Sequence, residues 1–202
     1  MENIFYLYLV KPIVFIFLYF YQFLKDAGLT IILVTILLKI VLMPLNYFIY
    51  LEEEKIKKVN KKINEATKNV KDFIKKSEII SKIYKEENIS PFKNIFLQLI
   101  NLPLLIAFFI SIPQFLSKID NSFLFNIINL KNPNIFLGIF SFLIQMIFVF
   151  YFSNPEHKKI SLFISSALIP IFFILPSSLL IYILTTIILT ILERKIIFVQ
   201  KI

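Results

Sequence analysis

One lysine, Lys39, lies near the middle of an apolar run, TILLKIVLMPLN, which covers residues 35–46. A lysine at the centre of a membrane span costs at least roughly 2.5–3.5 kcal/mol, and it usually faces a bundle interior or a wet cavity. Lys39 lies about ten residues from either end of its apolar stretch, so its side chain reaches a membrane interface poorly. Because no Asp or Glu lies well inside an apolar stretch, we expect Lys39 to occupy a polar cavity without an acidic partner.

Other polar side chains inside the apolar stretches could line the same cavity: Thr35, Gln98, Asn101, Gln145, Thr185 and Thr186. No catalytic constellation accompanies them. His157 is the single histidine, which we interpret as a loop residue, and the sequence has no Gly-rich phosphate loop. The absence of cysteine excludes disulfides and Cys-ligated metals. We therefore expect a physical function without a cofactor or a metal, and no enzyme activity.

The composition indicates a membrane protein. Of the 202 residues, 58% are hydrophobic and 17% are charged, whereas typical soluble domains are roughly 45–50% apolar and about 25% charged. Uncharged stretches of membrane-spanning length alternate with charged ones. The opening MENIFYLYLV has neither a basic start nor a small-residue cleavage site, so we do not expect a cleaved secretory signal.

The N-terminal apolar stretch, residues 3–24, is interrupted by Lys11 and Pro12. About a dozen apolar residues follow Pro12, fewer than the roughly 20 that a spanning helix needs. We therefore predict that residues 3–25 form an amphipathic helix in the membrane interface at the outer face. A short additional span is the alternative.

Residues 52–90 have a different character and predict a cytoplasmic coiled-coil hairpin. Between Leu51 and Lys93 the sequence has 12 Lys and 8 acidic residues. Apolar residues recur there at coiled-coil spacing, and further ones follow: Ile56, Val59, Ile63, Ala66 and Val70, then Phe73, Ile80, Ile83 and Tyr84. We expect the turn near residues 67–70. One continuous helix is the alternative, although it would extend about 50 Å without support.

The remaining pattern predicts five transmembrane helices. The stretch 160–192 has no charge, and as one helix it would be about 50 Å long against a hydrocarbon core of roughly 30 Å. It should therefore fold back at Pro176. The predicted spans are 28–51, 92–113, 134–152, 160–175 and 177–193, joined by an outer loop at 114–133 and a cytoplasmic loop at 153–159, with a cytoplasmic tail at 194–202. The fold class is an all-α integral membrane protein with an interfacial helix and a helical hairpin.

The positive charges predict the orientation. With the hairpin in the cytoplasm, 17 Lys and Arg residues lie on that side and four lie outside, and Lys39 is the remaining cation. This asymmetry follows the positive-inside rule, and it accounts for the net charge of +9 without a specific nucleic acid partner. We interpret the basic hairpin as a solvated surface, with anionic headgroups or a ribosome as alternative partners.

Four segments resemble the YidC/Oxa/Alb-type membrane protein insertases. GLTIILVTILLKIVLMPL (28–45) resembles the first core span, with its glycine, its basic residue and its closing Pro-Leu. KIYKEENISPFKNIFLQLINLP (82–103) resembles the end of the family's hairpin and the start of its second span. NLKNPNIFLGIFSFLIQ (129–145) resembles the third span, and LPSSLLIYILTT (175–186) resembles the last helix pair. The opening LVKPIVFIFLYFY is similar to the family's interfacial helix.

The resemblance implies roles for individual residues. Lys39 stands where the family has an arginine that charges a hydrophilic groove, and Ser178 stands where it has a glycine. Tyr182 matches the tyrosine of the last helix pair and joins the expected groove residues. Family positions with structural roles correspond to Gly28, Pro44, Pro91, Pro103, Gly138 and Pro176. We expect a minimal bacterial member without the large extracytoplasmic domain.

The implied function is insertion of nascent membrane proteins into the bacterial plasma (inner) membrane. A cytoplasm-open groove would pass short hydrophilic segments, and the apolar segment would move into lipid. Expected partners are nascent chains and the lipid bilayer, with a ribosome and a Sec translocon as further candidates, and the protein is expected to act as a monomer. The alternatives are a small anion channel or transporter that uses Lys39 as its anion site, and a chaperone without insertion activity.

Overall fold

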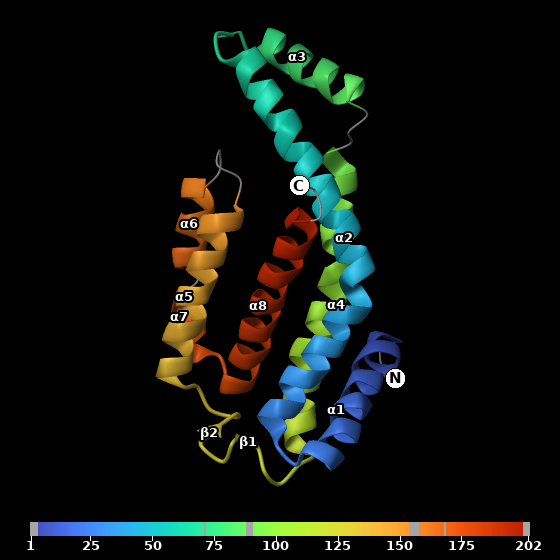
Figure 1. The fold of residues 1–202 in the computed structure, drawn as a ribbon, viewed down its shortest axis with the longest axis vertical. Helices are drawn as coiled ribbons and strands as arrows, with labels where there is room; N and C mark the ends of the chain where they lie inside the picture. Colours follow the sequence, from blue (N-terminus) through green and yellow to red (C-terminus); the bar gives the residue numbers. More distant parts are fainter. Residues whose placement is uncertain (1–3, 71, 88–90, 154–157, 168, 200–202) are drawn as a thin grey trace. The chain divides into compact units, whose positions relative to one another are not determined.

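The computed structural model describes residues 4–70, 72–87, 91–153, 158–167 and 169–199. It divides into two compact units: Met1–Met43 with Leu104–Ile202 form unit 1, and Pro44–Pro103 form unit 2. Two helices pass from one unit to the other, α2 (Ala27–Thr67) and α4 (Pro91–Ser117) (Figure 1). The crossing lies at Pro44 inside α2 and at Pro103 inside α4. Because proline has no backbone N–H, each helix lacks one backbone hydrogen bond at its crossing.

The N-terminal segment of unit 1 is helical without interruption. A short π-helix, η1 (Tyr6–Val10), leads into α1 (Lys11–Leu24), whose first turn contains Pro12. Together they form a 19-residue helix that is long and apolar enough to cross a membrane. The prediction that Pro12 leaves too short a helix is therefore wrong, because a proline in the first turn of α1 does not end the helix. Placement of this helix in the interface remains a prediction, with a span as its alternative.

Helix α2 extends over 41 residues and joins two segments that differ in charge and hydropathy and were predicted as separate elements. It contains the predicted span 28–51 and the first arm of the predicted hairpin, with no break between them. Helix α4 likewise extends beyond the predicted span 92–113 at its C-terminal end. Charge and hydropathy mark where a helix enters water, but they do not end its backbone hydrogen bonding.

The core of unit 1 joins α1, α2, α4 and α8 (Ser177–Val199). Phe17 is fully buried, with its ring stacked on Phe115 at 5.1 Å and edge-on to Phe108 at 5.7 Å. Phe108 in turn stacks on Tyr182 of α8 at 5.2 Å. Aromatic pairs of this kind contribute about 0.5–1.5 kcal/mol each beyond the burial of their area. The chain of rings fixes α1 and α8 on the same helix, α4.

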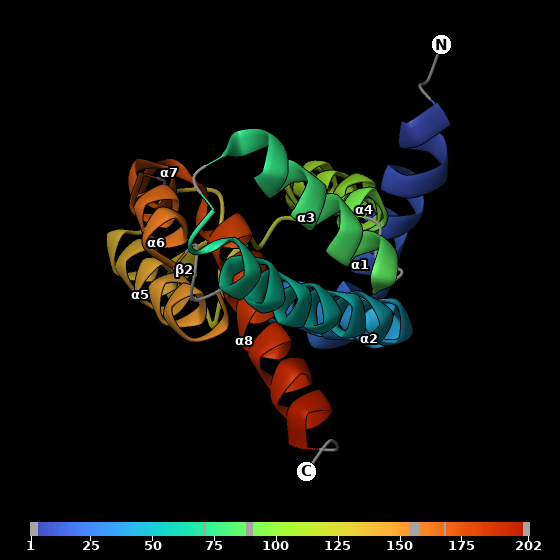
Figure 2. The ribbon, with the colours of Figure 1, turned by 90° about the horizontal axis from the view of Figure 1, so that it is seen from above.

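The second half of unit 1 begins with a short antiparallel pair, β1 (Phe123–Leu124) and β2 (Ile128–Asn129). The described helices that follow are α5 (Ile135–Phe152), α6 (Lys158–Ala167), α7 (Ile169–Ile174) and α8. Figures 1 and 2 both show α5, α6 and α7 side by side, and α5 also packs on α8. The predicted span 160–175 thus falls on two described helices, and Leu168 between them lies outside the described residues.

The chain leaves α7 at Leu175 and Pro176 and starts α8 at Ser177, where the sequence predicts a fold-back. The first two backbone N–H groups of α8 donate to the loop between β2 and α5: Ser177 to Asn132 at 3.0 Å, and Ser178 to Leu130, just after β2, at 3.1 Å. The Ser177 hydroxyl also donates to the Asn132 carbonyl at 2.7 Å. Groups that have no partner within a helix are thereby satisfied, and the start of α8 is fixed to this loop.

Helices dominate the described residues, and the two short strands are the only departure there from the all-α expectation. Three described helices are long and apolar enough to cross a membrane: Tyr6–Leu24, Ala27–Thr67 and Ile135–Phe152. A shorter apolar helix covers Leu102–Ser117. The protein is therefore an all-α membrane protein in class, and the count of five spans remains a prediction.

Unit 2 contains the charged end of α2 and the amphipathic helix α3 (Phe73–Glu86). Lys62 donates to Glu87, and the hydrogen bond and charge of this carboxylate raise the pKa of Lys62 above its ordinary value. The Tyr84 hydroxyl donates to the Asn60 side-chain oxygen at 3.4 Å. These contacts bring the C-terminal part of α3 back beside α2.

The predicted apolar seam of unit 2 is only partly correct. Val59 and Ile63 are buried, but Ala66 is exposed, and Thr67 is buried in its place. Phe73 is 83% exposed, and α3 has no buried residue. The arms therefore pack less closely than a continuous coiled-coil seam would require.

Candidate functional site

The ammonium group of Lys39 binds two side chains of α8. Its Nζ donates to Thr190 Oγ1 at 2.7 Å and lies 3.5 Å from Glu193 Oε2. Both charged side chains are largely buried, with 13% of Lys39 and 10% of Glu193 exposed. The Thr190 hydroxyl donates its own hydrogen to the Thr186 carbonyl at 2.8 Å, which leaves its oxygen to accept from Lys39.

Lys39 and Glu193 meet because α2 and α8 both start at the same loop. Asp26, just before α2, accepts from the Phe125 backbone, and Ser177 at the start of α8 donates to Asn132. At 1.5 Å per residue, Lys39 lies about 18 Å along α2 and Glu193 about 24 Å along α8. The length of the lysine side chain covers the difference. Because both helices begin at this loop, Lys39 and Glu193 lie at similar distances from it.

This geometry corrects the expectation that Lys39 has no acidic partner. The charge pattern predicts Glu193 as the last residue of a span, but α8 continues to Val199 and Glu193 is 8% exposed. The neighbouring Arg194 lies over two rings of α5, Phe148 at 5.8 Å and Phe152 at 5.6 Å. A charged cluster thus connects α2, α5 and α8 inside unit 1.

The predicted groove residues that the structure describes lie on the same helices as this cluster but do not bind Lys39. Thr35 is fully buried one turn before Lys39, and its hydroxyl donates to the Ile31 carbonyl at 2.7 Å. Tyr182 is 4% exposed and belongs to the aromatic core. Thr185 is half-buried and donates to Ile181, and Gln145 is half-buried on α5. Their role in a groove remains a prediction.

Two further predicted residues, Gln98 and Asn101, lie on α4 in unit 2, where the structure does not describe their side chains. The loop histidine, His157, also lies outside the described residues. The structure therefore shows only that Gln98 and Asn101 lie on α4, and their contribution to the site remains a prediction.

Sequence reasoning missed Thr190 and Glu193, although a signal was available. Four polar residues of α8 recur at spacings of four, four and three: Tyr182, Thr186, Thr190 and Glu193. Positions three and four apart lie on one face of a helix. A polar stripe that ends in an acid was therefore readable beside the Thr35 and Lys39 pair, which has the same spacing.

The two glycines both lie at close contacts. A Cβ at Gly138 of α5 would lie 2.7 Å from the backbone oxygen of Phe172 in α7. A Cβ at Gly28 of α2 would lie 2.5 Å from the side chain of Leu124 in β1. Distances under about 3 Å are not tolerated by real side chains, so both glycines allow an approach that another residue would prevent.

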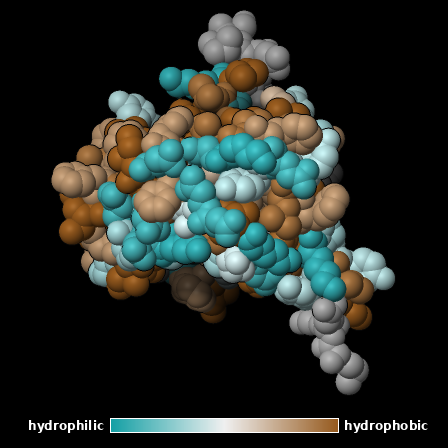
Figure 3. All heavy atoms as spheres, turned by 90° about the horizontal axis from the view of Figure 1, so that it is seen from below, coloured by the Kyte–Doolittle hydropathy of each residue, from teal (hydrophilic) through white to brown (hydrophobic). Residues whose placement is uncertain are grey.

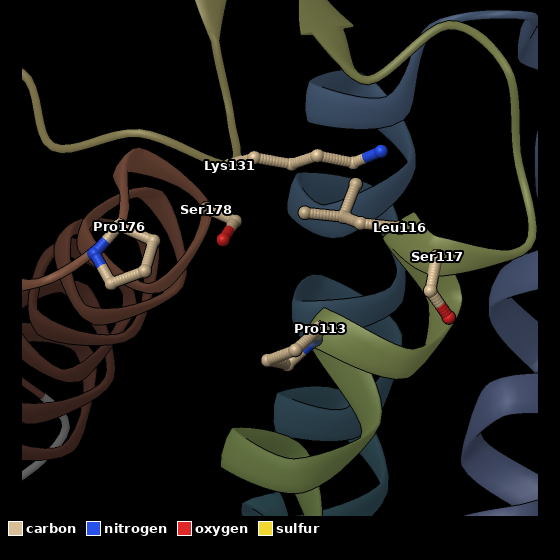
Figure 4. Close-up of a pocket in the computed structure, with 6 residues that line it drawn as sticks. All are labelled: Pro113, Leu116, Ser117, Lys131, Pro176 and Ser178. Carbon is tan, nitrogen blue, oxygen red and sulfur yellow. The ribbon is translucent and has the colours of Figure 1, made fainter.

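The end of unit 1 that carries β1 and β2 is hydrophilic, and Figure 3 shows a polar band across it with hydrophobic surface at its edges. A pocket of about 370 Å³ opens between the end of α4 and the start of α8, lined by Pro113, Leu116, Ser117, Lys131, Pro176 and Ser178. Figure 4 shows the Lys131 side chain extending past Leu116. Lys39 lies about 18 Å along α2 from this end, so the pocket is separate from the charged cluster.

Comparisons with known proteins agree with the resemblance of the motifs. The family described as 60Kd inner membrane protein matches residues 19–201. A membrane protein insertase YidC of Buchnera aphidicola subsp. Baizongia pistaciae is 28% identical over 197 residues, which cover 94% of this chain and 37% of the relative. A YidC of Pseudoalteromonas atlantica is 26% identical over 201 residues, which cover 96% and 37%. The chain thus spans little more than a third of the length of these relatives.

Proposed function

This chain belongs to the 60Kd inner membrane protein family, the YidC/Oxa/Alb-type proteins, and from that premise we propose that it is a membrane protein insertase. It takes short hydrophilic segments of nascent membrane proteins across the bilayer and releases their apolar segments into lipid. The relatives that carry the name insertase support this function.

The observation that carries the proposal is the buried ammonium of Lys39, held between two apolar helices of unit 1. A polar tail that moves from the cytoplasm into the bilayer loses its hydration, which costs free energy. For an acidic residue, attraction to a cation inside the bilayer offsets part of this cost. At low dielectric, one charge pair is worth several times its value in water. Lys39 therefore attracts acidic residues of the substrate into a groove that is open to the cytoplasm and to lipid and closed to the outside.

The remaining elements follow from the same proposal. Hydrophobic burial of the apolar segment in lipid along the first and last spans drives the step, and no chemical reaction or cofactor is required. Short helices thin the bilayer locally and lower the barrier for the polar segment. Thr35, Gln98, Asn101, Gln145, Tyr182 and Thr185 line the groove beside Lys39.

The protein is proposed to lie in the bacterial inner membrane with unit 2 and the C-terminus in the cytoplasm. The 17 cations on that side against four outside support this orientation. The basic surface of unit 2 makes first contact with the nascent chain or with a ribosome, and a Sec translocon is a further partner. The insertase is proposed to act as a monomer.

Complementation of an insertase-depleted bacterial strain tests the function, with insertion of a small Sec-independent substrate as the readout. The unchanged chain is expected to restore insertion. Lys39→Arg keeps the charge and should retain insertion of substrates with acidic tails, whereas Lys39→Ala should abolish it. Full activity of Lys39→Ala would refute the role of the charge, and failure of the unchanged chain, produced and integrated normally, would refute the function.

The second candidate function is an anion channel or transporter with Lys39 as its anion site. The buried lysine supports this candidate as well, and the Glu193 carboxylate at 3.5 Å opposes a free anion as it opposes an acidic residue of a substrate. Anion flux through proteoliposomes that is lost in Lys39→Gln would support this candidate instead.

A further inference from the structure

A second pocket of unit 1 lies between the N-terminal helix and the end of α4. Its volume is about 310 Å³. It shares no lining residue with the pocket beside Pro176, and neither Lys39 nor Glu193 lines it. The residues that line it come from η1, α1 and the C-terminal end of α4, and they include Tyr6, Lys11, Phe15, Leu18, Gln114 and Lys118.

Two lysines bring positive charge to this pocket. Lys11 is the first residue of α1, and Lys118 comes directly after the last residue of α4. Both side chains are exposed, and no acid is found among the described residues that line the pocket. Two like charges at one pocket whose described lining has no acid attract an anion.

A hydrogen bond between the two helices adds neutral donors to these charges. The Tyr6 hydroxyl donates to the Gln114 side-chain oxygen at 2.9 Å. A glutamine amide carries two N–H donors besides this oxygen, so the bond to Tyr6 leaves both donors for another acceptor. The Lys11 ammonium lies 6.0 Å from the centre of the Tyr6 ring, and its three donors allow it to bind more than one group. The pocket therefore suits an anion with several oxygens, such as a phosphate.

Apolar surface lies next to the charged part of the pocket. Lys11, Phe15 and Leu18 recur at spacings of four and three, which places them on one face of α1. Phe15 is 70% exposed, so this face offers apolar surface beyond the lysine. A ligand that fits carries an anionic group at one end and an apolar chain at the other.

The position of the pocket along α4 corresponds to the headgroup level of a bilayer. The apolar helix Leu102–Ser117 ends directly before Lys118. Lysines near the end of an apolar helix extend their charged group to the boundary between hydrocarbon and headgroups. In a membrane, the molecule that combines a phosphate at this boundary with an apolar chain is a phospholipid.

We propose that this pocket binds an anionic phospholipid. Its phosphate lies between Lys11 and Lys118 and beside the Gln114 amide, and an acyl chain lies along Phe15 and Leu18. The lipid thereby ties the N-terminal helix to α4 at the membrane surface. Because the ligand is a lipid and not a translocated segment, the proposal does not depend on the insertase function.

Native mass spectrometry of the full chain in detergent tests the site, with phosphatidylglycerol and phosphatidylcholine that carry the same acyl chains. Phosphatidylglycerol has a net negative charge, whereas the two lysines repel the positive choline group of phosphatidylcholine. The first phosphatidylglycerol is expected to bind at least about tenfold more tightly than phosphatidylcholine. The double variant Lys11→Gln with Lys118→Gln should lower the affinity for phosphatidylglycerol at least about tenfold.

The matched control is Lys25→Gln with Lys131→Gln. It removes the same charge from two exposed lysines that do not line this pocket, and it should keep the preference for phosphatidylglycerol. An equal loss in both double variants would mean that the lipid responds to surface charge alone. Unchanged affinity in Lys11→Gln with Lys118→Gln would mean that the lipid binds elsewhere. Either result would overturn the proposal.

Gln114→Glu tests the pocket without removing a lysine, and it decides the question by itself if the double variant does not accumulate. Its carboxylate still accepts from Tyr6, but a negative charge that repels the phosphate replaces the amide donors. The affinity for phosphatidylglycerol should fall, and unchanged affinity would contradict the site.

Inorganic phosphate distinguishes a lipid headgroup from a free anion. Phosphatidylglycerol is expected to raise the Tm of the unchanged protein in detergent, because a ligand that binds only the folded state stabilises it. Inorganic phosphate alone should leave the Tm unchanged, since it lacks the apolar part. An equal rise with inorganic phosphate would exclude the lipid as the ligand.

Discussion

The carboxylate of Asp26 accepts a hydrogen bond at 2.6 Å from the backbone N–H of Phe125, which lies 99 residues further along the chain. Its other oxygen accepts from the Leu29 backbone at 2.9 Å in the first turn of α2. Phe125 and Asn126 both have positive φ angles, 50° and 57°, a conformation that costs energy in residues other than glycine. One side chain thus begins α2 and holds the tight turn between β1 and β2 beside it.

Asp26→Ala is expected to destabilise unit 1 by about 1–3 kcal/mol, because it removes a helix cap and a charged hydrogen-bond acceptor. Thermal unfolding of the protein in detergent measures the loss as a lower Tm. Asp120→Ala changes an exposed acid in the segment between α4 and β1; it is the matched control and should leave the Tm nearly unchanged. Equal effects of the two substitutions would contradict the role assigned to Asp26.

Gly138→Ala is expected to separate α5 from α7, because its Cβ would lie 2.7 Å from a backbone oxygen that no side-chain rotation can move away. Overpacking of this kind typically costs about 1–3 kcal/mol. The Tm in detergent reports the effect. Ile139→Ala, at the next and exposed position, is the control. A Tm of Gly138→Ala at or above that of the unchanged protein would show that the contact can relax.

The charged pair gives a prediction for stability that is separate from substrate selection. Lys39→Ala removes the cation that lies 3.5 Å from the largely buried carboxylate of Glu193, and breaking a buried ion pair typically costs about 3–5 kcal/mol. The double variant Lys39→Ala with Glu193→Ala removes both charges and should be less destabilised than the sum of the two single variants. A double-mutant cycle on unfolding in detergent measures this coupling, and strict additivity would mean that the two charges do not interact.

The contact between Lys62 and Glu87 makes the packing of α3 on α2 sensitive to alkaline pH. Because Glu87 raises the pKa of Lys62 above 10.5, the contact contributes fully below that pH and is lost as the pH rises through the raised value. As the pH rises through this value, hydrogen exchange of the α3 amides in the unchanged protein should therefore accelerate by more than the intrinsic increase of exchange with pH.

Lys62→Gln should show the weaker protection of α3 already at neutral pH. Lys82→Gln is the matched control, because Lys82 pairs with Glu86 inside α3 and makes no contact with α2 through that pair. If the α3 amides are equally protected from hydrogen exchange in both variants, the Lys62 contact does not hold α3 on α2.

Deletion of residues 55–86 is expected to weaken substrate insertion while unit 1 still integrates into the membrane. The reason is that α1, α8 and the parts of α2 and α4 in unit 1 form their own buried core. Membrane extraction separates integration from activity. A deletion variant that no longer integrates would contradict the independence of unit 1.

Several features of this protein could be read from the sequence because they depend on local properties. The length and hydropathy of residues 28–51 and 134–152 predict helices that can cross a membrane, and the structure places α2 and α5 there. The charges of residues 52–90 likewise mark the part of the chain that forms most of unit 2. The order of the motifs from Gly28 to Tyr182 indicated the family, which the comparison with the 60Kd inner membrane protein confirmed.

The tertiary structure decided what depends on residues that are distant in the sequence. Lys39 was identified as a buried cation by its apolar neighbours, but its bond to Thr190 spans 151 residues. Local hydropathy could not place Glu193 inside the protein, because its burial follows from α8 starting at the same loop as α2 and continuing beyond the apolar stretch. The sequence by itself determined that Lys39 lies inside an apolar stretch, and only the packing of α2 on α8 decided that a carboxylate of the same chain lies 3.5 Å from it.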